Sequence, residues 1–251
     1  MKRTIGLDRE LRLRWLDIAA GLARTERNKL ALRAQLMDAL AEDIPAHFVR
    51  VKTCTVLIRT WLTVPPEHIE LRDRAFDLLR SSAPDQRVVA HWGMLLLAYP
   101  FFREIVSAIG RTASLQEDIS RGQIGRRATE TWGERTTVKR SILRVFQTLT
   151  DWGVLILNGD ENYHVTAARP ITDPMLAVWL IEATVRSRGS AIPFSGLVQA
   201  PENFPFQLTL TLADMTRSER FETFREGPEL LVGARHLDTF RLRTAIQTAS
   251  D

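Results

Sequence analysis

The stretch TTVKRSILRVFQTLTDWGVLILNGDENYHV, residues 136–165, decides the fold that this sequence predicts. Its first half carries apolar residues at the spacing of one helix face that is buried along its whole length. These residues are Val138, Ile142, Val145, Phe146, Leu149 and Trp152. Thr136 or Thr137 is expected to cap this helix through a side-chain hydroxyl, and Gly153 is expected to end it.

The second half of the stretch predicts a β-hairpin. Asn158-Gly159 separates the extended runs VLIL and NYHVTA, and Asn-Gly between such runs is a strong hairpin signal. Upstream, SLQEDIS at residues 114–120 predicts a short strand, and RGQIGRRATETWG at residues 121–133 predicts a further helix. The order strand, helix, turn, helix, hairpin is typical of a winged helix-turn-helix, whose second helix lies in the major groove of DNA.

The charge pattern of this unit favours nucleic-acid binding. Residues 120–150 contain seven arginines and lysines but only two glutamates. The outward face of the second helix is expected to show Lys139, Arg140, Ser141, Arg144, Gln147 and Thr148. The predicted contacts with double-stranded DNA are therefore Arg126, Arg127, Arg135, Thr137, Lys139, Arg140, Ser141, Arg144 and Gln147.

These candidates have different expected roles. Lys139, Arg140 and Arg144 are expected to contact phosphates or bases, because guanidinium and ammonium groups suit both. The arginines before the second helix are expected to contact the flanking backbone. Thr137 and Ser141 can donate to phosphates near the N-terminus of the helix, where the backbone dipole favours an anion.

An alternative function is that of a protein–protein adaptor or scaffold subunit of a larger complex, with the winged helix as an interaction module. Asp160 and Glu161 at the hairpin tip support this alternative, since a phosphate backbone repels them. Its expected docking surfaces are APENFPF at residues 200–206 and a helix at residues 174–188. Exposure of Met175, Val178, Trp179 and Val185 on that helix would favour the adaptor.

The remainder of the chain completes a mainly α fold with three predicted domains. Residues 1–112 form an all-α helical bundle of five to six helices, and residues 113–168 form the winged helix-turn-helix. Residues 169–251 form a small α+β region, in which QLTLTL is expected to be a strand, TRSERFETFREG a helix and PELLVGA a strand. A second basic cluster within residues 2–33 is expected to be an exposed helical face, and the alternative is a second contact with the duplex.

Composition argues against several other classes of protein. The single cysteine, Cys54, excludes an intramolecular disulfide and a cysteine-based zinc site. The histidines show no metal-ligand spacing, and no phosphate loop or nucleophile elbow occurs. We therefore expect no catalytic residues, metal or cofactor. The longest apolar run, WGMLLLAYPFF, is too short for a membrane span, so we expect a cytoplasmic protein without a membrane partner.

Two segments carry a resemblance to a known family. YPFFREIVSAIG at residues 99–110 is an aromatic-anchored helix, and residues 119–155 combine a tryptophan before the turn, Thr-x-Lys-Arg at the start of the next helix and a closing Gly-Val-Leu. Over residues 95–157 the chain resembles the BrxA-type small helical subunits of bacterial BREX phage-exclusion systems. The resemblance implies a non-enzymatic accessory protein that binds double-stranded DNA, acts with protein partners and serves antiviral defence.

Overall fold

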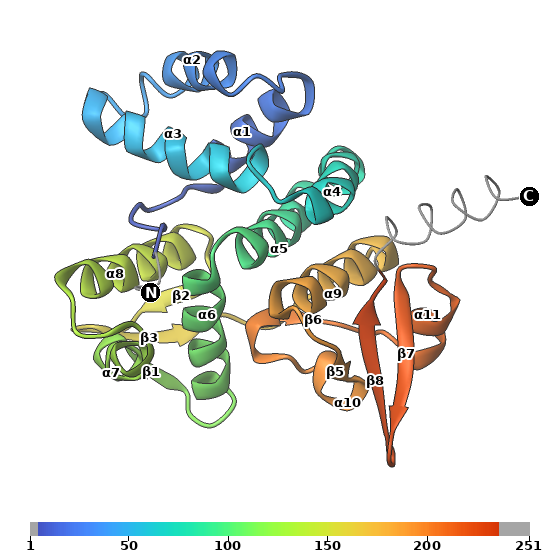
Figure 1. Ribbon diagram of the computed structural model, residues 1–251. Helices are drawn as coiled ribbons and strands as arrows, with labels where there is room; N and C mark the ends of the chain where they lie inside the picture. The colour runs from blue at the N-terminus through green and yellow to red at the C-terminus, as the bar shows by residue number, and fades with distance from the viewer. Residues whose placement is uncertain (1–4, 236–251) are drawn as a thin grey trace, which may run out of the picture.

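The computed structural model describes residues 5–235, and this part of the chain is mainly helical (Figure 1). The predicted five to six helices of the N-terminal segment are six. They are α1 (Leu13–Thr25), α2 (Lys29–Ala39), α3 (His47–Trp61), α4 (Ile69–Ser81), α5 (Arg87–Ala98) and α6 (Pro100–Ala113). The short 3₁₀ turns η1 (Pro66–His68) and η2 (Pro84–Gln86) precede α4 and α5.

The helix boundaries follow the local chemistry of the sequence. Asn28 caps α2 because its side-chain oxygen accepts hydrogen bonds from the backbone amides of Leu30 and Ala31. Pro100 is the first residue of α6. At this position the backbone amide has no partner within the helix, so the missing N–H of proline removes no hydrogen bond. Within the described residues no single helix is long and apolar enough to cross a membrane. Residues Pro84–Ala98 and Pro100–Ala113 reach that length and hydropathy only when they are taken as one pair, and the two parts are bent by 119° relative to each other.

A small sheet and two helices follow α6. The elements are β1 (Asp118–Ser120), α7 (Arg121–Trp132), α8 (Thr136–Asp151), β2 (Leu155–Leu157) and β3 (Asn162–Val165). The strands form an antiparallel sheet in the order β1-β3-β2, in which Tyr163 lies opposite both Ile119 and Leu157. The predicted hairpin is therefore confirmed. Gly159 in its loop has a φ of 73°, a left-handed conformation that glycine adopts without steric cost.

The predicted threonine cap of α8 is wrong. The N-cap residue is Arg135, and no side chain in the described part of the chain caps the helix, because Thr136 already lies inside its first turn. Both of the other predicted boundaries in this unit are confirmed, since α7 ends before Gly133 and α8 ends just before Trp152 and Gly153.

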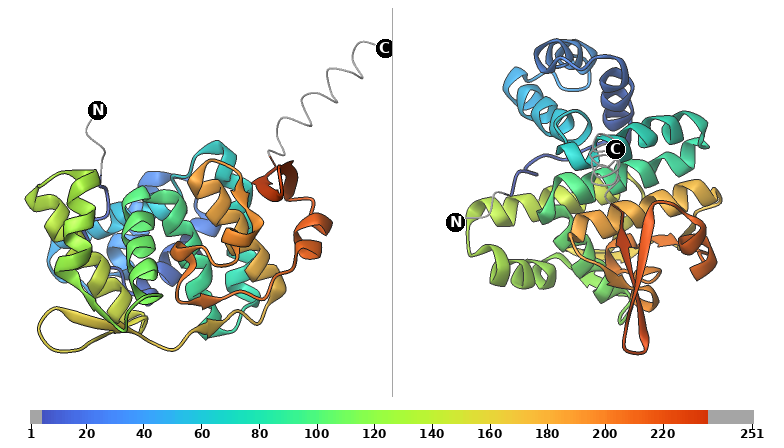
Figure 2. Two further views of the ribbon diagram at one scale, coloured as in Figure 1. Left: turned by 90° about the horizontal axis from the view of Figure 1, so that it is seen from below. Right: turned by 45° about the vertical axis from the view of Figure 1, so that its right-hand side comes forward.

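The longest helix of the C-terminal segment is the predicted helix α9 (Pro174–Arg188), which Asp173 caps and Gly189 ends. The other elements of this segment are short. They are β4 (Arg169–Pro170), β5 (Ile192–Pro193), α10 (Phe194–Leu197), η3 (Pro201–Asn203), β6 (Phe206–Gln207), α11 (Leu212–Arg217), β7 (Phe221–Glu226) and β8 (Glu229–Ala234). Figure 2 shows the β7–β8 hairpin projecting from the body. β5, β8 and β7 form one antiparallel sheet, and β4 pairs with β6 in parallel.

Two predictions for this segment are wrong. The strand expected over QLTLTL is reduced to Phe206–Gln207, because a capping box between Thr211 and Asp214 starts α11. The helix expected over TRSERFETFREG ends at Arg217, and its second half is strand β7. These residues form a strand because they pair with β8 across a turn at Gly227. This pairing outweighs the local helical pattern of the sequence.

One hydrophobic core runs through all three predicted domains. α6 stands between the α7–α8 unit and the C-terminal segment (Figure 1). The ring of Trp92 on α5 contacts Trp152 at the end of α8 and Phe206 on β6, with centroid distances of 6.1 and 5.3 Å. Trp179 of α9 donates a hydrogen bond to the carbonyl of Leu71 at 2.9 Å. The α7–α8 unit is therefore held on a continuous scaffold.

Candidate nucleic-acid interface

A groove lies between α7 and α8, and Glu161 of the β2–β3 loop contributes to its lining. Its volume is about 740 Å³. We call it the α7–α8 groove, and its lining is Arg121, Gly122, Gly125, Arg126, Thr129, Glu134, Thr136, Lys139, Arg140, Ile142, Leu143 and Glu161. Four of these residues are basic and two are acidic.

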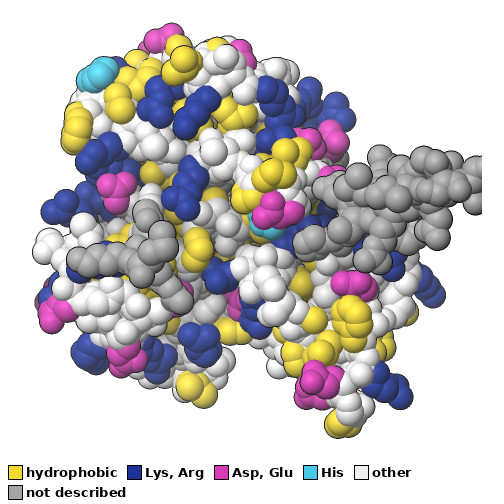
Figure 3. Space-filling model, viewed as in Figure 1, with side chains coloured by type: hydrophobic (Ala, Val, Ile, Leu, Met, Phe, Trp, Pro, Cys, Tyr) yellow, Lys and Arg dark blue, Asp and Glu magenta, His cyan; other side chains and the backbone are white. Residues whose placement is uncertain are grey.

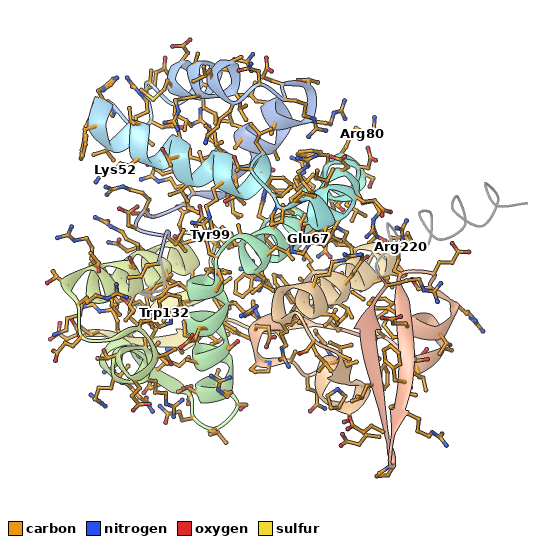
Figure 4. The ribbon with its side chains drawn as sticks, in the orientation of Figure 1. Lys52, Glu67, Arg80, Tyr99, Trp132 and Arg220 are labelled. Carbon is orange, nitrogen blue, oxygen red and sulfur yellow. The ribbon has the colours of Figure 1, made fainter. Side chains whose placement is uncertain are left out.

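The groove is open because α7 presents small side chains toward α8. Gly122, Gly125 and Thr129 are spaced so that they share one face of α7. A Cβ atom at Gly125 would already touch Ile142 of α8, at 3.9 Å. On its other face α7 is anchored to α6 through Trp132, which is labelled in Figure 4. Its ring packs edge-on against Phe101, with ring centroids 5.1 Å apart.

Two arginines in the groove have no partner within the described part of the chain. Arg126 on α7 and Arg140 on α8 are exposed, and neither forms an ion pair or a hydrogen bond there. Lys139 is different, since its Nζ lies 3.0 Å from Oε1 of Glu134. The groove therefore presents two uncompensated guanidinium groups from two different helices.

The other predicted basic contacts are directed elsewhere. Arg127 donates to the hydroxyl of Thr112 on α6 at 3.1 Å. Arg135 donates from Nε and Nη2 to the carbonyl of Trp132, at 3.1 and 2.9 Å. Arg144 is half-buried and donates to Oε1 of Gln147 at 2.8 Å. Thr137 is exposed but does not line the groove.

The expectation that Ser141 and Thr148 face outward is wrong, because both are buried. The extended segment before α1 covers this side of α8. The backbone amide of Leu11 donates to the hydroxyl of Thr148 at 3.0 Å, and Nε1 of Trp152 donates to the carbonyl of Leu11 at 2.8 Å. Ser141 lies two turns before Thr148 on the same face, so it cannot reach a phosphate.

The sequence prediction also missed residues of the groove. Arg121, Thr129 and Thr136 line it, and none of them was a candidate contact. The Gly-x-x-Gly spacing at residues 122–125 was a usable signal, since two glycines one turn apart leave a helix face bare. The acidic hairpin tip also has an unexpected partner, because Glu161 forms an ion pair with Arg121.

The surfaces expected for an adaptor are largely part of the core. On α9, Trp179 and Val185 are buried, Val178 is partly buried, and only Met175 is well exposed, at 67%. In the proline-rich segment, Glu202 and Asn203 are buried, and the carbonyl of Glu202 accepts a hydrogen bond from Trp92. The expected docking surfaces are therefore wrong for both segments.

The second basic cluster is spread out and largely paired with acids. Arg14 pairs with Asp43 and Arg27 with Asp73, at 3.0 and 3.1 Å. Lys2 and Arg3 lie outside the described residues. On the face in Figure 3, lysine and arginine side chains are scattered over several elements and do not form one patch.

Comparisons with known proteins found no match to this chain among protein-family models, curated proteins or solved structures.

Proposed function

We propose that this chain binds double-stranded DNA through a winged helix-turn-helix formed by α6, β1, α7, α8, β2 and β3. In this proposal α8 is the recognition helix and the β2–β3 hairpin is the wing. The order of the elements and the β1-β3-β2 sheet support it. Following the resemblance of residues 95–157, we further propose that DNA binding serves a phage-exclusion system.

The observation that carries the proposal is the placement of Arg126 and Arg140. Each guanidinium is exposed and uncompensated, and both line one groove between the two helices. A guanidinium group binds phosphate through a rigid fork of N–H donors, so two of them across a groove suit a polyanion. Lys139 can add a third contact if it exchanges Glu134 for a phosphate.

The contact set of the proposal differs from the one that the sequence predicts. Arg126, Lys139 and Arg140 remain as contacts, and Arg121, Thr129 and Thr136 join them because they line the same groove. Arg144 and Gln147 on α8 are proposed as weaker DNA contacts outside the groove. Their side chains are already hydrogen-bonded to each other, and this bond competes with a bond to DNA. Ser141 is excluded because it is buried.

The experiment is a duplex-binding titration of the wild type and the Arg126→Ala/Arg140→Ala variant. Both arginines are exposed, so the substitutions are expected to weaken binding without loss of folding. Arg217→Ala/Arg225→Ala is the matched control, because it removes the same charge at exposed positions on α11 and β7. Equal loss of affinity in both variants would show that net charge alone, and not the groove, determines binding.

One observation favours the alternative of a protein–protein adaptor. Ile156 and Leu157 on β2 are 49% and 55% exposed, and β2 is an edge strand of its sheet. Exposed apolar residues on an open edge are typical of strand pairing with another chain. Ile156→Lys/Leu157→Lys would abolish association with a partner in this alternative and leave the groove unchanged.

A further inference from the structure

The tip of the β2–β3 hairpin is attached to the start of α7. The Glu161 carboxylate forms an ion pair with the Arg121 guanidinium, and the backbone amide of Arg121 donates to the carbonyl of Glu161 at 3.0 Å. These residues are 40 positions apart in the chain, so the contact fixes the loop relative to the helix. Both side chains line the α7–α8 groove.

The Glu161 carboxylate has the chemistry of a phosphate contact. Carboxylate and phosphate groups are both anions that accept hydrogen bonds from the guanidinium fork of arginine. Arg126 and Arg140 in the same groove have no such anion among the described residues. The groove of the free protein thus contains one arginine bound to an internal anion and two arginines that bind none.

We infer that Glu161 restrains DNA binding by occupying the place of a backbone phosphate at Arg121. This inference rests on the proposed function of the groove. DNA displaces the carboxylate, and Arg121 then contacts the backbone beside Arg126 and Arg140. The acidic residue at the hairpin tip, which a direct contact between the wing and DNA does not explain, thus competes with DNA phosphate for Arg121.

The ion pair is exposed enough for such an exchange. The side chains of Arg121 and Glu161 are 25% and 57% exposed, and water and salt screen pairs of this kind strongly. The pair between Lys139 and Glu134 also lies in the groove, but its partners are five residues apart and connect α8 only to the preceding turn. Within residues 5–235, Glu161 is the hairpin residue whose side chain forms an ion pair with a groove arginine.

Asp160 provides a matched control for Glu161. It is the neighbouring residue, it is exposed, and it forms no ion pair or hydrogen bond within residues 5–235. Asp160→Asn therefore removes the same charge at the neighbouring position of the hairpin without releasing an arginine. The difference between Glu161→Gln and Asp160→Asn measures the release of Arg121.

The test measures duplex binding of the full chain by fluorescence anisotropy at two salt concentrations. We expect Glu161→Gln to bind roughly two- to fivefold more tightly than Asp160→Asn, a change in the range of an exposed ion pair. Adding Arg121→Gln to both variants is expected to abolish this difference, because no released arginine remains. Thermal unfolding of each variant verifies that it is folded.

Equal affinities of Glu161→Gln and Asp160→Asn overturn the inference, as does weaker binding by Glu161→Gln. A difference that persists without Arg121 also overturns it, because another group then carries the effect. If the wild type does not bind and Glu161→Gln does, the restraint is supported in a stronger form. If neither binds at low salt, the proposed function fails together with the inference.

Discussion

Trp152 at the end of α8 donates a hydrogen bond from its indole nitrogen to the carbonyl of Leu11, at 2.8 Å. The amide of the same residue, Leu11, donates to the hydroxyl of Thr148, one turn earlier on α8. Both backbone polar groups of Leu11, its amide and its carbonyl, thus form hydrogen bonds with side chains at the C-terminal end of the helix that we propose to bind DNA. This pairing ties α8 to the N-terminal helices and leaves its opposite face free for the groove.

Thr148→Val is expected to destabilise the protein by about 1–3 kcal/mol. Valine has nearly the shape of threonine, but it leaves the buried amide of Leu11 without an acceptor. Thr150→Val is the matched control on the same helix, because Thr150 is exposed and its change is expected to cost less than about 0.5 kcal/mol. Urea unfolding measures both. Equal effects would contradict the role given to the Leu11 contact.

Acid is expected to destabilise the protein through His91. This histidine is fully buried on α5, and its Nε2 lies 3.1 Å from Oδ1 of Asp17 on α1. Burial lowers the pKa of His91 below its ordinary value of 6.5, although the hydrogen bond and charge of Asp17 oppose this. Burial raises the pKa of Asp17, but its hydrogen bond and ionic attraction to His91 outweigh burial and lower it below 3.8.

The sign of the pH dependence follows from these directions. Near and below pH 6.5 the unfolded chain binds more protons at His91 than the folded chain, so the free energy of unfolding falls as pH falls below that value. Protonation of Asp17 lowers the free energy of unfolding further below pH 3.8, because its pKa is lower in the folded chain than in the unfolded chain. His91→Gln is expected to flatten the slope of unfolding free energy between about pH 7.5 and 5.5. His47→Gln, at an exposed position, is the control, and an unchanged slope in His91→Gln would contradict this account.

Gly93→Ala is expected to weaken the packing of α9 on α5. A Cβ atom at residue 93 would lie 2.7 Å from Cη2 of Trp179, and a buried indole ring has no room to move. Overpacking of this kind costs about 1–3 kcal/mol. Gly21→Ala on α1 is the matched control, since no atom of the described residues lies within 4 Å of its new methyl group and helix propensity favours alanine by about 0.5–1 kcal/mol. The midpoint temperature of thermal unfolding is therefore expected to fall for Gly93→Ala and to rise for Gly21→Ala.

Local signals in the sequence predicted most of the helical fold. Pro100 and Gly133 mark helix boundaries through their own backbone preferences, and Asn158-Gly159 marks the hairpin in the same way. The apolar stripe from Val138 to Trp152 predicted which face of α8 is buried, because that face is continuous over four turns. Features of this kind depend on residues close together in the chain.

Features that depend on distant partners were not predicted. Strand β7 is defined by its pairing with β8, and the two-residue strand β6 by its pairing with β4 far upstream. The burial of Thr148 depends on Leu11, which is 137 positions away. The site shows the same division: Arg126 and Arg140 follow from charge and spacing, but the partner of Glu161 depends on how the hairpin folds back on α7.

The central claim is that the α7–α8 groove binds duplex DNA, and the salt dependence of binding tests it most directly. Each phosphate contact adds roughly 0.9 to the slope of log affinity against log salt concentration. Arg126→Ala/Arg140→Ala is therefore expected to reduce the wild-type slope by about one to two units, and Arg217→Ala/Arg225→Ala to leave it unchanged. A folded Arg126→Ala/Arg140→Ala variant with the wild-type slope and affinity, or failure of both the wild type and Glu161→Gln to bind at low salt, would contradict the claim.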